Sequence, residues 1–187
     1  MEDLIRYCQP KGELPGLVGS KSGSILVIGS ASCVTHDLNA YDKLHNGERM
    51  LINDMIPVYR GKAEHVASLH PAKLYMWARV RKDKPLAHST HRAGEWPPEI
   101  WNIHADGGTS GLFGVIISFL MGFDSVVLAG IPVSDEQKIT GQVGGISAET
   151  MRQEWMRFAP FFGDKVKSLS GWTREQFGAP ECLNPSM

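Results

Sequence analysis

The sequence has few cysteines, no long apolar segment and almost no net charge. Its three cysteines, Cys8, Cys33 and Cys182, are far apart and form no C-x-x-C pair, so neither a disulfide framework nor a zinc knuckle is expected. The longest apolar run, residues 112–123, is too short to cross a bilayer. Residues 1–6 are acidic and lack the apolar core of a signal peptide. We therefore expect a cytoplasmic protein without a membrane segment.

The near-neutral charge also removes any bulk attraction to nucleic acid. The 187 residues carry 19 Lys or Arg and 20 Asp or Glu, a formal net charge of −1, so nucleic acid is not expected as a partner. Hydrophobic residues make up 42% of the chain, which is typical of a globular protein. One compact domain is the default at this length. A homo-oligomer is left open.

Strands and helices alternate along the chain after an irregular start. Proline and glycine recur through residues 1–23, which predicts an irregular amino-terminal segment, followed by a single α/β domain over residues 24–187. Short apolar runs predict strands at 24–29, 49–53, 65–69 and 125–130, with weaker strands at 86–88 and 165–169. Helical patterns cover 37–45, 71–78, 109–121 and 148–162. This alternation predicts a doubly wound, Rossmann-like, mostly parallel sheet with helices on both faces.

Three loops follow predicted strands or open a predicted helix, and all three carry small or polar residues. The candidate ligand-binding residues in them are Gly29, Ser30 and Ser32 in the first loop, Gly108, Thr109, Ser110 and Gly111 in the second, and Gly130 and Ser134 in the third. Ligands bind beyond the carboxyl ends of parallel strands, and the free N–H groups of a helix start favour phosphate or carboxylate. The first loop lacks the G-x-G-x-x-G spacing of dinucleotide-binding proteins. A tight glycine turn before an ordinary helix N-cap is the alternative for the second loop.

Two histidines and two polar side chains are the remaining candidates. His70 follows the strand at 65–69 and precedes Pro71, so it is a candidate general acid or base, with a helix-capping histidine as the alternative. His104 is a second candidate. Asn53 and Asp54 close the second strand and are placed to bind a sugar hydroxyl, or to form an Asx turn. The histidine spacing fits no familiar zinc site. No Lys or Arg clamp for phosphate is conspicuous, so a need for Mg²⁺ is left open.

The glycine-rich helix start and the strand after it resemble a known sequence block. Residues 108–111 (GTSG), an apolar helix and residues 120–131 (LMGFDSVVLAGI) resemble the 6-hydroxymethylpterin diphosphokinase-like proteins and the bacterial sialyltransferases that use a CMP-sugar. Residues 25–32 resemble their first strand and turn, and the SLHP and TSGL segments resemble uncharacterised bacteriophage proteins. The resemblance covers about residues 24–134. The chain departs from it at His70 and Pro132, where aspartates are usual, and at Gly107, where the sialyltransferases have arginine.

The resemblance implies a nucleotide ligand. It places Gly29, Ser30 and Ser32 near the base or phosphate, Asn53 near the sugar, and Thr109 and Ser110 on phosphate. We therefore expect a nucleotide-utilising transferase that moves a glycosyl or diphosphoryl group from a nucleotide or nucleotide-sugar donor, in the host cytoplasm if the chain is phage-encoded. A non-enzymatic nucleotide-binding or phage assembly protein is one alternative. An enzyme acting on DNA is another, and it would require a local basic groove.

Overall fold

The computed structural model describes residues 16–43, 47–91, 99–101, 109–135, 138–141 and 146–181. Seven strands of these residues form one sheet in the order β5-β4-β3-β2-β1-β6-β7, and every neighbouring pair is parallel. The strands are β1 (Ser24–Ile28), β2 (Glu48–Ile52), β3 (His65–Ala67), β4 (Leu86–Ser89), β5 (Glu99–Ile100), β6 (Ser125–Ala129) and β7 (Val166–Ser168). The predicted doubly wound parallel sheet is confirmed.

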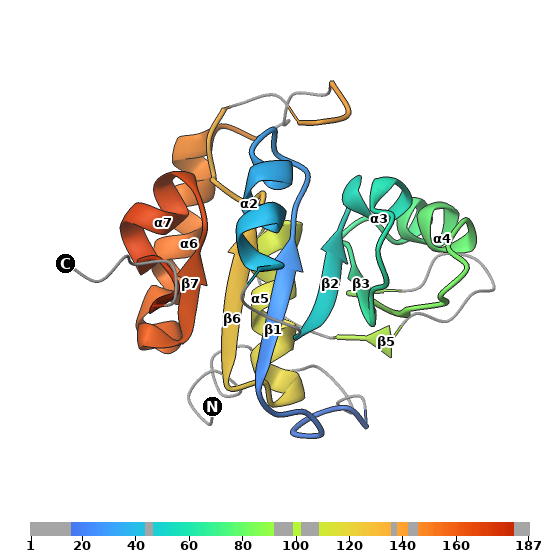
Figure 1. Ribbon diagram of the computed structural model, residues 1–187. Coiled ribbons are helices and arrows are strands. Elements are labelled where there is room, and N and C mark those ends of the chain that lie inside the picture. The colour runs from blue at the N-terminus through green and yellow to red at the C-terminus, as the bar shows by residue number, and fades with distance from the viewer. Residues whose placement is uncertain are drawn as a thin grey trace.

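Helices cover both faces of this sheet (Figure 1). The helices are α2 (Val34–Tyr41), α3 (Met55–Val58), α4 (Pro71–Arg79), α5 (Ser110–Met121), α6 (Ala148–Phe162), the 3₁₀ turn η1 (Gly163–Lys165) and α7 (Gly171–Phe177). Alternate residues of a strand point to opposite faces. Leu26 of β1 therefore packs in a core with α2, α3 and α4, while Val27 packs in a second core with α5 and α6.

The order of the strands reverses at β1. From β1 the chain adds β2, β3 and β4 in one direction, with α2, α3 and α4 on one face. Helix α5 then crosses the other face and places β6 on the free side of β1, where Ile28 lies opposite Ala129. The loops after β1 and β6 consequently lead to opposite faces of the sheet. Such a switch point leaves a crevice at the carboxyl ends of the two strands.

Helix α5 is buried along its whole length. All twelve of its residues are buried, as the apolar pattern around its circumference predicts. The Thr109 hydroxyl accepts a hydrogen bond from the Leu112 N–H and so caps the first turn. Gly122 ends the helix in the left-handed conformation at φ 108°, which glycine adopts without steric cost. Both helix ends match the sequence prediction.

Some elements differ from the prediction. Helix α2 begins at Val34 instead of Asp37, and Asp37 lies buried in its first turn. The elements α3, β5 and α7 were not predicted, because they have four, two and seven residues and show no readable period. The predicted irregular segment is described from residue 16, where turns pack Leu17 and Val18 against the core. No described helix combines the length and apolar character needed to span a membrane.

Candidate functional site

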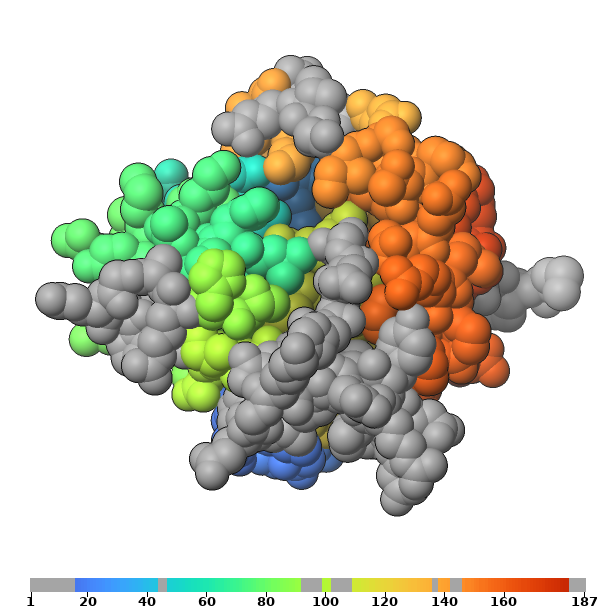
Figure 2. Space-filling view, turned by 180° about the vertical axis from the view of Figure 1, so that it is seen from behind, coloured from blue at the N-terminus to red at the C-terminus, as the bar shows by residue number. Residues whose placement is uncertain are grey.

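A cavity of about 280 Å³ lies at the carboxyl ends of the central strands. The three predicted loops meet around it, together with the ends of β2 and β3. Its lining consists of Gly29, Ser30, Ala31, Ile52, Asn53, Leu69, His70, Thr109, Ser110, Gly111, Gly130, Ile131, Pro132, Val133, Ser134, Lys138, Ile146 and Met151. Figure 2 shows a hollow between the green residues of the α4 side and the orange residues of the α6 side, with the blue of the β1 end at its floor. The cavity therefore sits at the switch point.

Two glycines bring the ends of β1 and β6 close together. A Cβ added at Gly29 would lie 2.5 Å from the carbonyl oxygen of Gly130, and one added at Gly130 would lie 2.6 Å from that of Gly29. Gly130 also has φ +62°, a conformation that costs other residues energy. From the sequence, both glycines are candidate ligand-binding residues. The contacts show that they first allow the two strands to meet and form one wall of the cavity.

The start of α5 forms a second, polar wall. The Ser110 hydroxyl accepts a hydrogen bond from the Leu69 N–H at 3.2 Å, and the Thr109 hydroxyl is the helix N-cap. Both oxygens thus use a lone pair within the protein, and both O–H groups remain able to donate to a ligand. The amides of Ser110 and Gly111 precede the first intrahelical hydrogen bond. This wall therefore presents donors and the positive end of a helix dipole.

The ends of β2 and β3 are joined by side-chain hydrogen bonds. The Ser68 hydroxyl donates to Asn53 Oδ1 at 2.7 Å and accepts from the His70 N–H at 2.9 Å. Asn53 has φ +49°, in the left-handed region that asparagine tolerates better than most residues. Asn53 lines the cavity, and the exposed His70 lies on its rim. Predicted residues from two strands thus meet at one point.

A lysine that sequence reasoning missed adds a positive charge. Lys138 lines the cavity and its Nζ lies 2.7 Å from Asp54 Oδ2. It is held there by an isolated antiparallel bridge to Ala31 and by the Ile139 N–H, which donates to the Ser30 carbonyl at 2.8 Å. No carboxylate appears in the described lining. The Asp54 carboxylate offsets the charge of Lys138, so the described lining is close to neutral.

The loop after β6 contains a strained residue and an orphaned hydroxyl. Val133 has φ +50°, which is costly for a β-branched residue and is often found at functional sites. Next to it, Ser134 Oγ is buried and has no hydrogen-bond partner among the described residues. A buried hydroxyl without a partner costs free energy. A ligand with polar groups in the cavity could satisfy it.

Most of the predicted site residues reach this cavity. Gly29, Ser30, Asn53, His70, Thr109, Ser110, Gly111, Gly130 and Ser134 line it. Ser32 is exposed and lies outside the lining, and Asp54 contributes only by pairing with Lys138. His104 and Gly108 lie outside the described residues. The sequence carried no signal for Lys138, whose place depends on a bridge between distant loops.

The fold allows comparison with proteins of known structure. No family model and no curated protein matches the sequence. A mammalian sialyltransferase matches the structure with a TM-score of 0.54 and 13% identity, over 91% of this chain and 77% of its own. The MAf glycosyltransferase from Magnetospirillum magneticum AMB-1 matches with a TM-score of 0.56 and 11% identity, over 90% of this chain and 37% of its own. This chain therefore shares its α/β fold with these two proteins.

These likenesses concern the fold. At 11% and 13% identity they carry no substrate from those proteins to this chain. They agree with the sialyltransferase part of the sequence resemblance, and they add nothing for the diphosphokinase-like or bacteriophage parts. This chain also spans little more than a third of the MAf glycosyltransferase, at 37%.

A second polar cluster lies away from the cavity, on the α5 face of the sheet. The Trp101 indole N–H donates to His88 Nδ1 at 2.9 Å, and His88 Nε2 lies 3.0 Å from His65 Nδ1. His65 Nε2 lies 2.9 Å from Glu48 Oε2, and Glu48 also accepts from Lys21 Nζ at 3.0 Å. We call these five residues the histidine relay.

The indole fixes the proton positions in the relay. An indole N–H can only donate, so His88 carries its proton on Nε2 and donates it to His65, which in turn donates from Nε2 to Glu48. Burial lowers the pKa of His65, against the opposing effect of Glu48, and burial lowers the pKa of His88 well below its usual value, with His65 and Lys21 adding to the effect. Both histidines are therefore neutral at pH 7. No group of three or more His, Cys, Asp or Glu among the described residues is placed to hold a metal ion.

Proposed function

We propose that this chain is a glycosyltransferase that binds the nucleotide of a nucleotide-sugar donor in the cavity at the β1–β6 switch point. The observation that carries the proposal is the meeting, around one cavity, of the α5 start, the β1 and β6 loops and the β2 end. These are the parts of an open parallel sheet that bind phosphate and sugar groups. The likeness to two glycosyltransferases supports glycosyl over diphosphoryl transfer.

The walls of the cavity suggest which group of the donor each would hold. The amides and hydroxyls at the α5 start are proposed to bind the phosphate oxygens, because they combine free donors with a helix dipole. Lys138, which pairs with Asp54, would add a further donor there. The Asn53 amide is proposed to bind a sugar hydroxyl. Ser134 Oγ, buried without a described partner, would bind a polar group of the ligand.

The reaction requires one bond to form and one to break. A hydroxyl oxygen of the acceptor attacks the anomeric carbon of the sugar, and the bond from that carbon to the phosphate oxygen of the donor breaks. The proton of the acceptor hydroxyl passes to a base, for which His70 on the cavity rim is proposed. The leaving phosphate carries negative charge, which the α5 start and Lys138 would stabilise. We assign this charge stabilisation to the chain's own donors and leave a need for Mg²⁺ open to the test below.

Isothermal titration calorimetry with CMP, CDP, UDP, ATP and GTP, each with and without Mg²⁺, tests the proposal. We expect one nucleotide to bind with a dissociation constant below millimolar and to raise the thermal unfolding midpoint. The matching nucleotide-sugar should then be hydrolysed slowly or transferred to an added acceptor. The absence of binding by every nucleotide at millimolar concentration would overturn the proposal. Tight binding without any turnover would favour a non-enzymatic nucleotide-binding protein.

A further inference from the structure

The charge of the chain is unevenly distributed. Residues 55–91, which contain α3, β3, α4 and β4, carry seven Lys or Arg and two Asp or Glu. The cations are Arg60, Lys62, Lys73, Arg79, Arg81, Lys82 and Lys84, and the acids are Glu64 and Asp83. The formal charge of this segment is thus +5, and that of the rest of the chain is −6 because the total is −1. We call residues 55–91 the basic lobe.

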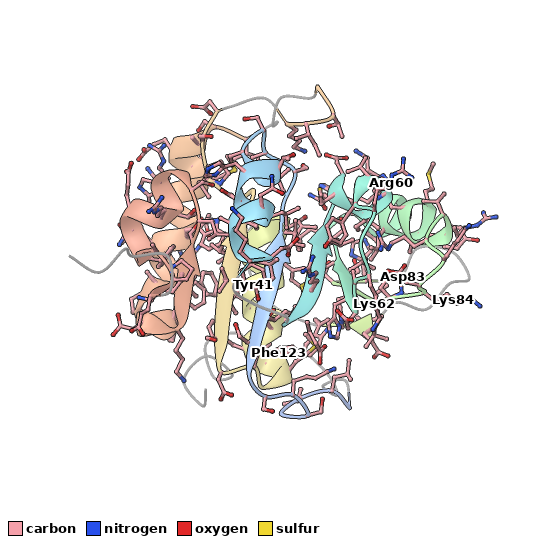
Figure 3. The ribbon with its side chains drawn as sticks, viewed as in Figure 1. Tyr41, Arg60, Lys62, Asp83, Lys84 and Phe123 are labelled. Carbon is pink, nitrogen blue, oxygen red and sulfur yellow. The ribbon has the colours of Figure 1, made fainter. Side chains whose placement is uncertain are left out.

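Most cations of the basic lobe have no acidic partner. The two acids pair with Lys62 and Arg81, and the other five cations form no ion pair within the described residues. Figure 3 shows Lys62, Asp83 and Lys84 on the side of the molecule formed by α3 and α4, with Lys84 pointing outward. The lobe therefore presents a positive surface to its surroundings.

The same lobe exposes apolar side chains. Of the seven large hydrophobic residues that are exposed in the described chain, four belong to the lobe, namely Val58, Met76, Val80 and Leu86. Met76 is 68% exposed and Val80 66%. They are four residues apart at the end of α4, so they lie on one side of the helix. Lys73, one turn before Met76, is exposed on the same side.

The opposite side of α4 is occupied by the core. Leu74 is fully buried, and Trp77 and Ala78 pack against the core that α2 and α3 share. The exposure of Met76 and Val80 is consequently not a by-product of a loosely packed helix. Helix α4 has two apolar surfaces, and the outer one has no described partner within the chain.

Cationic residues line a hollow beside this outer surface. It lies between the end of α4 and the start of β4, has a volume of about 470 Å³, and is lined by Ala78, Arg79, Arg81, Lys84, Pro85, Leu86 and Ala87. Arg81 already donates to the carbonyl oxygens of Ile56, Tyr59 and Gly61. Arg79 and Lys84 form no ion pair in the described chain. Two cations and the half-exposed Leu86 thus surround one opening.

We propose that the basic lobe docks on the surface of an anionic lipid membrane. The hollow between Arg79 and Lys84 receives a lipid phosphate, and Met76 and Val80 enter the boundary between head groups and acyl chains. Basic residues beside exposed apolar ones are the pattern of proteins that lie on membranes. This binding is peripheral and agrees with the absence of a spanning helix among the described residues. It does not depend on the proposed glycosyl transfer.

The apolar residues decide between a membrane and a nucleic acid. Nucleic-acid surfaces combine cations with polar or stacking aromatic groups that contact phosphates and bases. Met76 and Val80 would remain in water in such a complex, whereas a lipid surface would bury them. The charge complementarity of a +5 lobe with anionic lipid supplies the attraction, which is worth about fivefold in binding per cation near the surface.

Vesicle co-sedimentation of the full chain tests this inference. We would compare vesicles of phosphatidylcholine alone with vesicles of phosphatidylcholine and phosphatidylglycerol in equal amounts. The chain should sediment with the anionic vesicles and remain in solution with the neutral ones. The triple variant Lys73→Gln, Lys82→Gln, Lys84→Gln should lose at least about 30-fold in vesicle affinity. The double variant Met76→Ser, Val80→Ser should lose about tenfold or more through the lost apolar burial.

The control variant changes exposed residues of the same types elsewhere. Met156 on α6 is 43% exposed, and Met156→Ser with Lys165→Gln and Arg174→Gln should bind vesicles like the unaltered chain. Among the substituted residues, only Lys84 has a positive φ, at +47°. Circular dichroism should therefore show that the variants are folded. Equal binding by the lobe variants and the unaltered chain would overturn the inference, as would absence of sedimentation with anionic vesicles. Tighter binding to a DNA duplex, lost in the triple variant alone, would replace the membrane with nucleic acid.

Discussion

At the scale of single residues, Ser110 is the sharpest test of the proposed nucleotide site. Its hydroxyl lies at the start of α5 in the cavity and is held by the Leu69 N–H. Replacing Ser110 with Glu would put a carboxylate where a phosphate is proposed to bind. We expect nucleotide affinity to fall at least about 100-fold, because the like charges repel and the site is filled.

Two further variants make this prediction specific. Ser110→Ala removes one hydrogen-bond donor and should cost about tenfold in affinity. Gln176→Glu adds the same charge on the exposed side of α7 and should leave affinity unchanged. Calorimetry with the best nucleotide measures all three. Unchanged binding by Ser110→Glu would show that the nucleotide binds elsewhere.

Gly130 tests the contact between β1 and β6. An alanine Cβ there would lie 2.6 Å from the Gly29 carbonyl oxygen and 2.7 Å from Val34 Cβ, in a residue with φ +62°. We expect Gly130→Ala to lower the free energy of unfolding by about 3 kcal/mol, from backbone strain and crowding together.

Gly19 supplies the matched control for Gly130. It has φ +67°, and nothing lies within 4 Å of an added Cβ, so Gly19→Ala should cost only about 1 kcal/mol. Urea denaturation of the two variants measures the difference. Equal losses would mean that backbone conformation alone, and not the close contact of the two strands, requires glycine at 130.

At the scale of elements, the histidine relay connects β2, β3 and β4 with Trp101. Both histidines have a pKa below the value of about 6.5 that they take in an unfolded chain. As pH falls below 6.5, the unfolded state binds protons that the folded state does not. Stability is therefore fully present above pH 7 and is lost as pH falls toward the folded-state pKa values. We expect the free energy of unfolding to fall between pH 7 and pH 5, by at most about 2 kcal/mol for each of the two histidines.

Urea unfolding at intervals from pH 5 to pH 8 measures this loss. His88→Gln should remove the larger part of the pH dependence, because the pKa of His88 is lowered further than that of His65, although the variant itself is less stable. His36→Gln is the control, because the His36 side chain is 88% exposed, and it should retain the full dependence. A flat stability profile over this range would contradict the arrangement of the relay.

The elements that sequence patterns predicted are the long and strongly apolar ones. Strands β1 and β6 and helices α5 and α6 were predicted nearly to their bounds, since each has a clear period or an unbroken apolar run. The two-residue β5 was missed, because its pairing with β4 depends on the sheet and not on its own residues. The start of helix α2 was predicted at Asp37, three residues after its actual start at Val34. An aspartate usually marks the exposed first turn of a helix, whereas Asp37 is buried and accepts a hydrogen bond from the Gly130 N–H.

The candidate site follows the same rule. Residues that come shortly after strands, such as Asn53 after β2 and His70 after β3, could be predicted, because parallel strands place all their carboxyl ends at one edge. Lys138 could not be predicted, since a bridge to Ala31 places it and no local pattern encodes that bridge. The relay was missed for a similar reason: its members are spread over residues 21–101 and meet only once the strands have paired.

At the scale of the whole molecule, the formal charge of −1 is the sum of a basic part and an acidic part that nearly cancel. The basic lobe has +5 and the remainder −6. At pH 7.5 and low salt, we expect the protein to be retained by a cation exchanger although its sequence pI is about 6.6, because local patches and not net charge govern such contacts.

Charge reversal tests this uneven distribution. Lys73→Glu, Lys82→Glu and Lys84→Glu together should abolish retention by the cation exchanger. The same three-charge reversal at the exposed Lys43, Lys165 and Arg174 should preserve it. Loss of retention in both variants would mean that net charge and not the basic lobe controls the contact.

The central position of β1 also sets the order in which the chain can fold during synthesis. Gly23, just before β1, donates its N–H to the Asp124 carboxylate, 101 residues later in the sequence. Until α5 and β6 have left the ribosome, one edge of β1 has no partner, and Val27 lacks the helix that covers it. Open strand edges and uncovered apolar faces favour aggregation. The emerging amino-terminal half is therefore the stage at which a chaperone would matter most, and it is not a stable fragment for expression on its own.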